Sequence, residues 1–122
     1  MTLRALSILM LSAPAAWAQD NPIRGTYGDA NGCLQSAGQA DANEPGFILT
    51  PHLIERSDTT CPIRRLVENL DGELAKAEVA CLGGNDGYWI ETYRFAPLPG
   101  EDGYIIDRAD DPAFRVEVRR CG

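Results

Sequence analysis

The sequence is poor in the residues on which most enzymes and metal proteins depend. Its 122 residues include one histidine, His52, and none of the four cysteines stands in a C-x-x-C pair. A zinc site needs paired Cys or His ligands at short spacing, and a redox dithiol needs the C-x-x-C pair. His52 follows a proline in an expected turn, so we interpret it as a surface residue and not as a general base. With no G-x-S-x-G motif either, the sequence predicts no catalytic residue, no metal site and no cofactor.

Positive charge is also scarce. The chain has 11 Lys and Arg residues against 18 Asp and Glu residues, and its formal net charge is −7. Binding to nucleic acid or to an anionic membrane needs clustered basic residues, so neither partner is expected. This excess of acidic residues suits a soluble protein that meets a basic partner. The length allows a single domain.

Residues 1–18 have the pattern of a cleaved signal peptide. Arg4 precedes a run of about a dozen mostly apolar residues, and the stretch ends on Ala16-Trp17-Ala18. Small residues at these positions are what signal peptidase accepts, so we expect cleavage before Gln19. Serines and a proline interrupt the run, which is too short for a membrane span of about 20 residues. The sequence therefore predicts one exported domain over residues 19–122.

The chain also lacks the marks of a eukaryotic secretory protein. It has no N-x-S/T sequon, and Lys76 is its only lysine among basic residues that are otherwise arginine. This bias is common in GC-rich bacterial genomes. Together with the short basic region of the signal, it favours a periplasmic or secreted protein of a Gram-negative bacterium.

Four cysteines in a small exported chain predict two disulfides. They are Cys33, Cys61, Cys81 and Cys121. A hairpin turning at Asp71-Gly72 would bring Cys61 opposite Cys81, which favours Cys61–Cys81 together with Cys33–Cys121. The sequential pairing, Cys33–Cys61 with Cys81–Cys121, stays open because the loop entropies of the two sets are nearly equal.

The hydrophobic pattern favours an all-β fold. Segment 88–95 is dense in β-formers with Trp89, Tyr93 and Phe95 on one face, where Glu91 is the exception, and 114–119 alternates apolar with charged residues. About seven short strands spaced about ten residues apart predict a small antiparallel barrel or sandwich. Segment 61–82 is ambiguous: its apolar residues also fall at helical spacing, so an α+β fold with a helix there is the alternative. The turn signal at 71–72 favours two strands.

Two polar segments are expected to be loops. Residues 31–46 contain little to bury and predict a long surface loop pinned at Cys33, after a short strand over residues 23–27. Asp29-Ala30-Asn31-Gly32 begins like a calcium loop, but the position that requires glycine is Leu34. Gly83-Gly84-Asn85-Asp86-Gly87 resembles one turn of a calcium β-roll, which binds only as stacked repeats. We interpret the second segment as a tight turn.

Two groups of residues are candidates for a binding surface. Tyr88 and Trp89 follow the turn expected at residues 83–87. As neighbours in a strand they face opposite sides, so we expect Tyr88 to be exposed and Trp89 to be in the core or at a contact surface. Acidic residues cluster on later turns near the C-terminus, and the binding candidates there are Tyr104, Glu101, Asp102 and Asp107. Such a patch would steer a basic partner with salt-dependent on-rates.

The function favoured by these features is that of a small exported acidic binding protein, an inhibitor or accessory subunit that acts by protein–protein contact. In size, export and acidity the chain is similar to small bacterial envelope barrels that inhibit lysozymes, which are basic. It lacks the S-G-x-x-Y signature of one such group, so no inhibitory residue is carried over. The alternative is a small carboxylate- or calcium-dependent hydrolase, which needs a cleft with two acidic groups and a raised carboxyl pKa.

Overall fold

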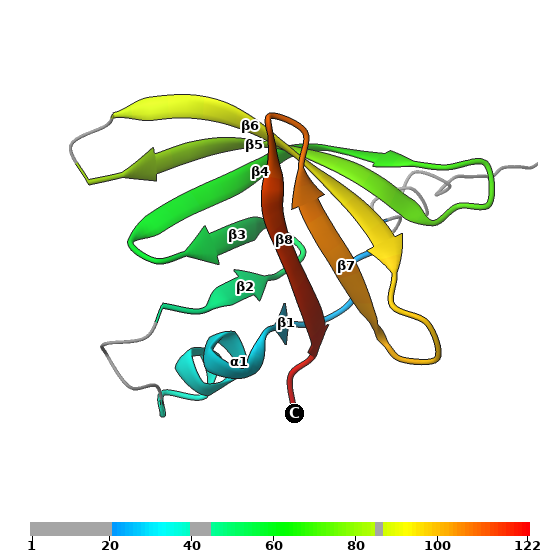
Figure 1. The fold of residues 1–122 in the computed structure, drawn as a ribbon, viewed down its shortest axis with the longest axis horizontal. Coiled ribbons are helices and arrows are strands. Elements are labelled where there is room, and N and C mark those ends of the chain that lie inside the picture. The colour runs from blue at the N-terminus through cyan, green and yellow to red at the C-terminus, as the bar shows by residue number, and fades with distance from the viewer. Residues whose placement is uncertain (1–20, 40–44, 85–86) are drawn as a thin grey trace, which may run out of the picture.

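A computed structural model, which describes residues 21–39, 45–84 and 87–122, shows an antiparallel barrel (Figure 1). Each strand pairs with the next and β8 pairs with β1, which closes the barrel. The elements are β1 (Tyr27–Gly28), α1 (Ala30–Ser36), β2 (Phe47–Leu49), β3 (Leu53–Arg56), β4 (Thr59–Glu68), β5 (Leu74–Gly83), β6 (Tyr88–Pro97), β7 (Gly103–Arg108) and β8 (Asp111–Arg120). The predicted all-β class is confirmed, as a barrel of eight strands in place of about seven. The predicted signal peptide, residues 1–18, lies outside the described residues.

The ambiguous segment forms the long hairpin β4–β5. The side-chain oxygen of Asn69 accepts hydrogen bonds from the backbone N–H groups of Asp71 (2.9 Å) and Glu73 (3.0 Å). Gly72 takes a positive φ of 79°, a conformation that glycine adopts without steric cost. The turn at 71–72 therefore prevails over the helical spacing of the apolar residues, and the helix considered for 61–82 does not form. Within the described residues, no helix is long and apolar enough to cross a membrane.

Both disulfides follow the favoured pairing. Cys61 on β4 bonds to Cys81 on β5 across the hairpin, with their Cα atoms 4.0 Å apart. Cys33, in α1, bonds to Cys121, which follows β8, and this link spans 88 residues of sequence. The second bond fixes the helix to the C-terminal end of the barrel, so both ends of the domain are covalently held.

The loop expected over residues 31–46 is wrong for its first part, where the chain forms α1. The side chain of Asp29 caps the helix by accepting the backbone N–H of Gly32 at 2.7 Å. A Cβ atom at Gly32 would collide with the carbonyl oxygen of Phe47, so glycine lets the helix backbone lie directly against β2. Little apolar surface is needed for such backbone packing, which is why composition indicated a loop. The strand expected over 23–27 is confined to Tyr27–Gly28, and residues 40–44 lie outside the described chain.

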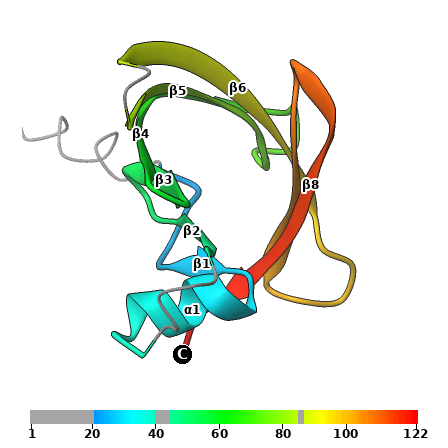
Figure 2. The same ribbon diagram turned by 60° about the vertical axis from the view of Figure 1, so that its left-hand side comes forward.

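The core fills the barrel with inward-facing residues of all the long strands. Figure 2 shows the sheet curling from β4–β6 round to β8, with α1 lying below β1 and β2. In β8, Phe114, Val116 and Val118 face inward and alternate with outward charged residues, as the sequence predicts. Buried core residues include Leu49, Ile54, Cys61, Val79, Cys81, Tyr93, Ile106 and Val118.

Candidate functional site

The start of β6 and the end of β5 carry three exposed large apolar side chains. Leu82, Tyr88 and Ile90 are 52%, 62% and 42% exposed. Leu82 lies opposite Tyr88 in the β5–β6 register. Because successive side chains in a strand alternate between faces, Ile90 shares the outer face with Tyr88. The exposure expected for Tyr88 is therefore found, and it belongs to a contiguous patch of apolar side chains.

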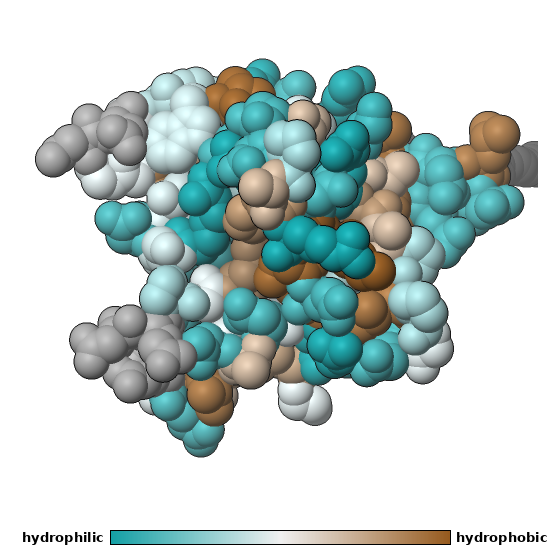
Figure 3. All heavy atoms as spheres, in the orientation of Figure 1, coloured by the Kyte–Doolittle hydropathy of each residue, from teal (hydrophilic) through white to brown (hydrophobic). Residues whose placement is uncertain are grey.

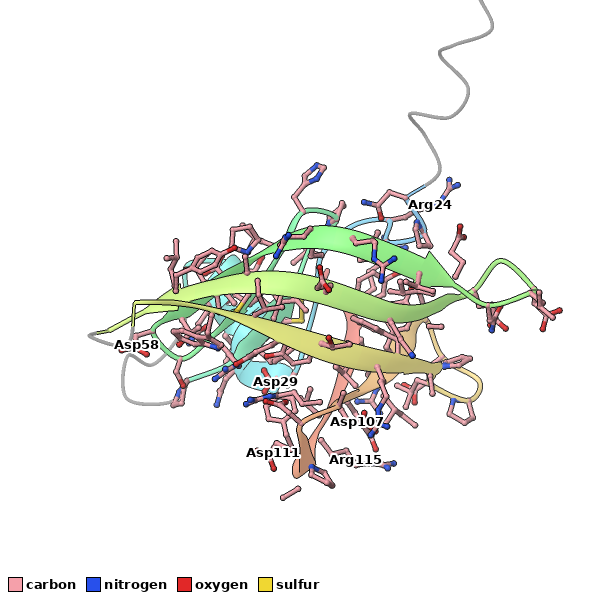
Figure 4. All side chains as sticks on the ribbon, turned by 90° about the horizontal axis from the view of Figure 1, so that it is seen from above. Arg24, Asp29, Asp58, Asp107, Asp111 and Arg115 are labelled. Carbon is pink, nitrogen blue, oxygen red and sulfur yellow. A yellow bond between two sulfur atoms is a disulfide. The ribbon has the colours of Figure 1, made fainter. Side chains whose placement is uncertain are left out.

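Carboxylates border this patch at the same end of the barrel. Glu55 pairs with Thr60, which pairs with Leu82, so one row of outward residues runs from β3 to Tyr88. Asp58 lies in the β3–β4 turn, and Figure 4 shows it at the end where hairpin β5–β6 terminates. Within the described chain, neither Glu55 nor Asp58 forms an ion pair or a side-chain hydrogen bond. We name Leu82, Tyr88, Ile90, Glu55 and Asp58 the hairpin surface.

Trp89 faces the interior of the barrel, opposite to Tyr88. It is half-buried and packs against the edge of the core. Its indole N–H donates to Oε2 of Glu91 at 2.6 Å. The sequence left Trp89 between a core role and an exposed role, and the structure gives it an inward position with a polar partner.

Glu91 is a buried carboxylate that is 3% exposed and held by four side chains. Besides Trp89, the Tyr93 hydroxyl donates to Oε1 at 2.8 Å and Arg56 Nη2 donates to Oε2 at 2.6 Å. Nη2 of Arg108 lies 3.4 Å from Oε2. Burial alone would raise the pKa of Glu91, but the donors from Trp89 and Tyr93 and the two guanidinium charges hold it below its usual value. Glu91 is therefore a structural anion at neutral pH.

The described acidic residues differ in two respects from those of an acid catalyst or a thiolate metal site. The carboxyl groups with shifted pKa values among the described residues, Glu91, Glu101, Asp102 and Asp110, all shift downward. Ligand atoms of Cys61, Cys81 and Glu91 lie within 4.8 Å of one another, but the two sulfurs form a disulfide and offer no thiolate. Asp29 of the calcium-like stretch caps α1, and Asn85 and Asp86 lie outside the described residues.

The acidic candidates near the C-terminus are matched with arginines. Glu101 and Asp102 lie together in the β6–β7 turn, whereas Asp107 lies in β7. The partners are Arg119 for Glu101 at 2.7 Å, Arg120 for Asp102 at 2.6 Å and Arg94 for Asp107 at 2.6 Å. Each pair is solvent-exposed and locally neutral, so the negative field expected at this rim is weakened.

Tyr104 lies at the same end, with its ring turned inward. It packs edge-on against Tyr27 and Phe95, with ring centroids 5.3 Å and 5.6 Å away. The hydroxyl of Tyr27 donates to Asp102 at 2.9 Å. Burial and this hydrogen bond raise the pKa of Tyr27 to about 12. Tyr104 is thus half-buried in an aromatic cluster beside the paired acids.

Sequence reasoning missed Arg56 and Arg108, which hold Glu91. The available signal was Glu91 itself, a lone acid on the apolar face of β6, since a buried carboxylate requires cationic or donor partners. Its partners come from β3 and β7, 35 residues before Glu91 and 17 residues after it, so local spacing does not reveal them. No family model, curated protein or solved structure matches this chain.

Proposed function

We propose that this chain is a small exported acidic binding protein, periplasmic or secreted, that acts by contact with another protein as an inhibitor or accessory subunit. The hairpin surface carries the proposal. Leu82, Tyr88 and Ile90 form one outward apolar patch centred on a tyrosine, and tyrosines are frequent anchors of protein interfaces. The patch lies on the paired strands β5 and β6, and Cys61–Cys81 ties β5 to β4, so binding would order little additional chain. Two disulfides fit an oxidising compartment.

The partner best suited to this surface is a basic protein. The chain has a net charge of −7. Glu55 and Asp58 border the patch without cationic partners in the described chain, whereas Glu101 and Asp102 are matched by arginines. Unmatched carboxylates beside an apolar anchor favour a surface with an apolar centre and a cationic margin.

The hydrolase alternative finds no support in the carboxylate environments. It requires a carboxyl group that stays protonated near neutral pH, and therefore a raised pKa. The buried carboxylate, Glu91, has a lowered pKa and is fully occupied by donors. Its environment favours a structural role within a binding domain.

The test uses the oxidised protein with one altered residue at a time. Tyr88→Ser removes the central aromatic of the hairpin surface. Leu70→Ser is the matched control, because Leu70 is fully exposed in the turn between β4 and β5 and lies outside the hairpin surface. Proteins captured from periplasmic and culture extracts at low and high salt are identified, purified and titrated against each variant.

The proposal expects a basic protein whose affinity falls at least tenfold with Tyr88→Ser, hardly changes with Leu70→Ser and weakens as salt rises. Glu55→Gln or Asp58→Asn should reduce that salt dependence. Glu101→Gln, which changes the net charge equally, should not. Capture that yields no protein at low salt, or a purified partner that binds Tyr88→Ser as tightly as the unaltered protein, would overturn it.

A further inference from the structure

Strand β8 has one edge that is paired only at its C-terminal end. On one side β7 pairs with β8 along most of its length, but on the other side β1 pairs with Arg119 and Arg120 alone. Figure 1 shows β1 as a short strand beside this end of β8. After Gly28 the chain leaves the sheet and enters α1. Among the described strands, none pairs with residues 113–117 of β8 on the side of β1, and we name this stretch the open edge.

The hydrogen bonds at the end of β8 show which residues turn their backbone groups toward the open edge. Successive residues of a paired strand direct their N–H and C=O groups to opposite sides. The N–H of Arg120 donates to a carbonyl of the β6–β7 turn at 3.1 Å, whereas that of Cys121 donates to the carbonyl just before β1 at 2.8 Å. The register between β7 and β8 has no shift over residues 115–119. The backbone groups of Arg115 and Glu117 therefore point to the open edge.

Four backbone groups on the open edge have no protein partner. The N–H and C=O groups of Arg115 and Glu117 form no hydrogen bond with the backbone of any described residue on this side. Both residues are exposed, so another chain can reach these groups. A row of unpaired N–H and C=O groups along an extended strand is complementary to the backbone of a second extended chain.

A cleft along the open edge gives room for a side chain of such a second chain. The cleft has a volume of about 240 Å³ and lies between residues 114–116 of β8 and residues 45–47. Phe114 and Val116 face inward there and are half-buried against the core. Figure 3 shows hydrophobic atoms at the centre of this face, along the course of β8 in Figure 1, with hydrophilic side chains around them. An apolar side chain on the inner side of a second chain would therefore contact apolar atoms.

The outer face of the open edge carries a cation without a partner. Arg115 points away from the barrel (Figure 4) and forms no ion pair or hydrogen bond with any described residue. Its neighbour on β7, Asp107, is already bonded to Arg94 at 2.6 Å. Glu117 lies 3.4 Å from Nη2 of Arg119. Opposite charges directly across two strands attract each other, so a second chain is favoured when it places an acidic side chain opposite Arg115.

We propose that the open edge of β8 binds an extended segment of a partner protein by antiparallel β-pairing, with an acidic side chain opposite Arg115 and an apolar side chain beside Phe114 and Val116. The segment takes the course that β1 leaves when it turns into α1, in the direction in which β1 already pairs with β8. The residues opposite Arg115 and Glu117 each exchange two backbone hydrogen bonds with β8. The open edge shares no residue with the hairpin surface.

The experiment titrates the ¹⁵N-labelled, oxidised protein with the peptide acetyl-Val-Lys-Val-Glu-Val-amide and follows the amides of β8 by NMR. Antiparallel pairing sets the Glu of this peptide opposite Arg115 and its Lys opposite Glu117. One control peptide is N-methylated at Lys and Glu, whose N–H groups face β8 in this pairing. The other is N-methylated at the central Val, whose N–H faces away.

The peptide should give saturable shifts in β8 and should slow hydrogen exchange at the amides of Arg115 and Glu117, which exchange fast in the free protein. Methylation at Lys and Glu should raise the Kd at least tenfold, because two hydrogen bonds are lost, whereas methylation at the central Val should change it less than twofold. Replacing the Glu of the peptide by Gln should raise the Kd about twofold to fivefold.

Two variants of the protein separate the backbone from the side chain. Arg115→Pro removes the N–H that faces the open edge and leaves the hydrogen bonds to β7 in place, so the fold should tolerate it and binding should be lost. Arg115→Ala keeps the N–H, so it should weaken binding only as much as the Gln peptide does. If Arg115→Pro unfolds the chain, the two methylated peptides still decide the outcome.

Equal affinities of the two methylated peptides, no saturable shift, or slow exchange of both edge amides in the free protein would each overturn the proposal. Protection that rises with protein concentration in the absence of peptide would assign the open edge to a second copy and overturn it as well. Tyr88→Ser should leave the Kd of the peptide unchanged. Failure here therefore leaves the proposed contact at the hairpin surface untouched.

Discussion

Replacing Glu91 by glutamine removes the charge at the centre of the buried network without changing its volume. In the native state its two oxygens accept from Trp89, Tyr93 and Arg56. The amide of glutamine keeps one accepting oxygen and turns the other into a donor. That donor would face either the Trp89 and Arg56 donors or the Tyr93 hydroxyl. The variant therefore leaves at least one donor facing another donor, or forces Tyr93 to reorient.

The structure sets the size of this effect. Removing one partner of a buried ion pair costs about 3–5 kcal/mol, because the other charge stays buried without compensation. The side chains of Arg56 and Arg108 are 23% and 17% exposed, so water solvates them in part. We therefore expect Glu91→Gln to lower the free energy of unfolding at pH 7 by about 2–3 kcal/mol.

The effect should depend on pH in one direction. The pKa of Glu91 is lowered in the folded protein and returns to about 4.5 in the unfolded chain. The stability that its ionised form provides is thus fully present above about pH 4.5 and is lost as pH falls through the lower folded-state pKa. The difference between wild type and Glu91→Gln should shrink below pH 4.5.

Urea unfolding followed by far-UV circular dichroism, with the disulfides intact, measures this difference at pH 7 and at steps down to pH 3. With m of about 1–3 kcal/mol per M, the midpoint at pH 7 should fall by about 0.7–3 M. Glu117→Gln is the control, because Glu117 is exposed and its ion pair with Arg119 is worth at most about 1 kcal/mol. An unchanged midpoint in Glu91→Gln, or a difference that stays constant from pH 7 to pH 3, would refute the role of Glu91 as a buried anion.

Two further predictions concern the cross-links and the tyrosine at the other end of the barrel. Replacing Cys33 and Cys121 by serine should lower the free energy of unfolding by about 4.6 kcal/mol, and replacing Cys61 and Cys81 should lower it by about 3.3 kcal/mol, because the first bond closes the longer loop. Urea midpoints of the two double variants test this order. A larger loss in the Cys61 and Cys81 variant would contradict it. Asp102→Asn should lower the pKa of Tyr27 from about 12 but keep it above the usual 10.0, because burial remains when the acceptor charge is lost. Ultraviolet titration of the phenolate measures it, and an unchanged pKa would show that Asp102 does not act on Tyr27.

Most of the fold was predictable because it is encoded locally. Turn residues at Asp71-Gly72 fixed one hairpin, and through it the pairing of Cys61 with Cys81. Alternation in 114–119 identified the inner face of β8. Helix α1 was missed because its packing uses backbone contact at Gly32, which has no hydrophobic periodicity. Closure into a barrel was left open because the pairing of β1 with β8 joins residues about 90 positions apart in sequence.

The candidate sites were predictable only where one strand determines them. Alternation along β6 predicted that Tyr88 is exposed, but it left Trp89 between the core and a contact surface, and the structure shows it facing inward. Glu91 was visible as an exception on an apolar face, but its arginines are fixed by the neighbouring strands and not by sequence spacing.

The net charge of −7 is a poor guide to where this protein meets a partner. At the C-terminal rim, carboxylates and guanidinium groups lie 2.6–2.7 Å apart, and the fields of such close pairs largely cancel beyond a Debye length of about 8–10 Å. The excess negative charge must then act where acids lack such partners, as at Glu55 and Asp58. Substitutions that change the net charge equally at the C-terminal rim and at the hairpin surface distinguish steering by the total charge from steering by the local field. Steering by the total charge requires equal effects on association, whereas steering by the local field requires the effect to follow the unmatched acids beside Tyr88.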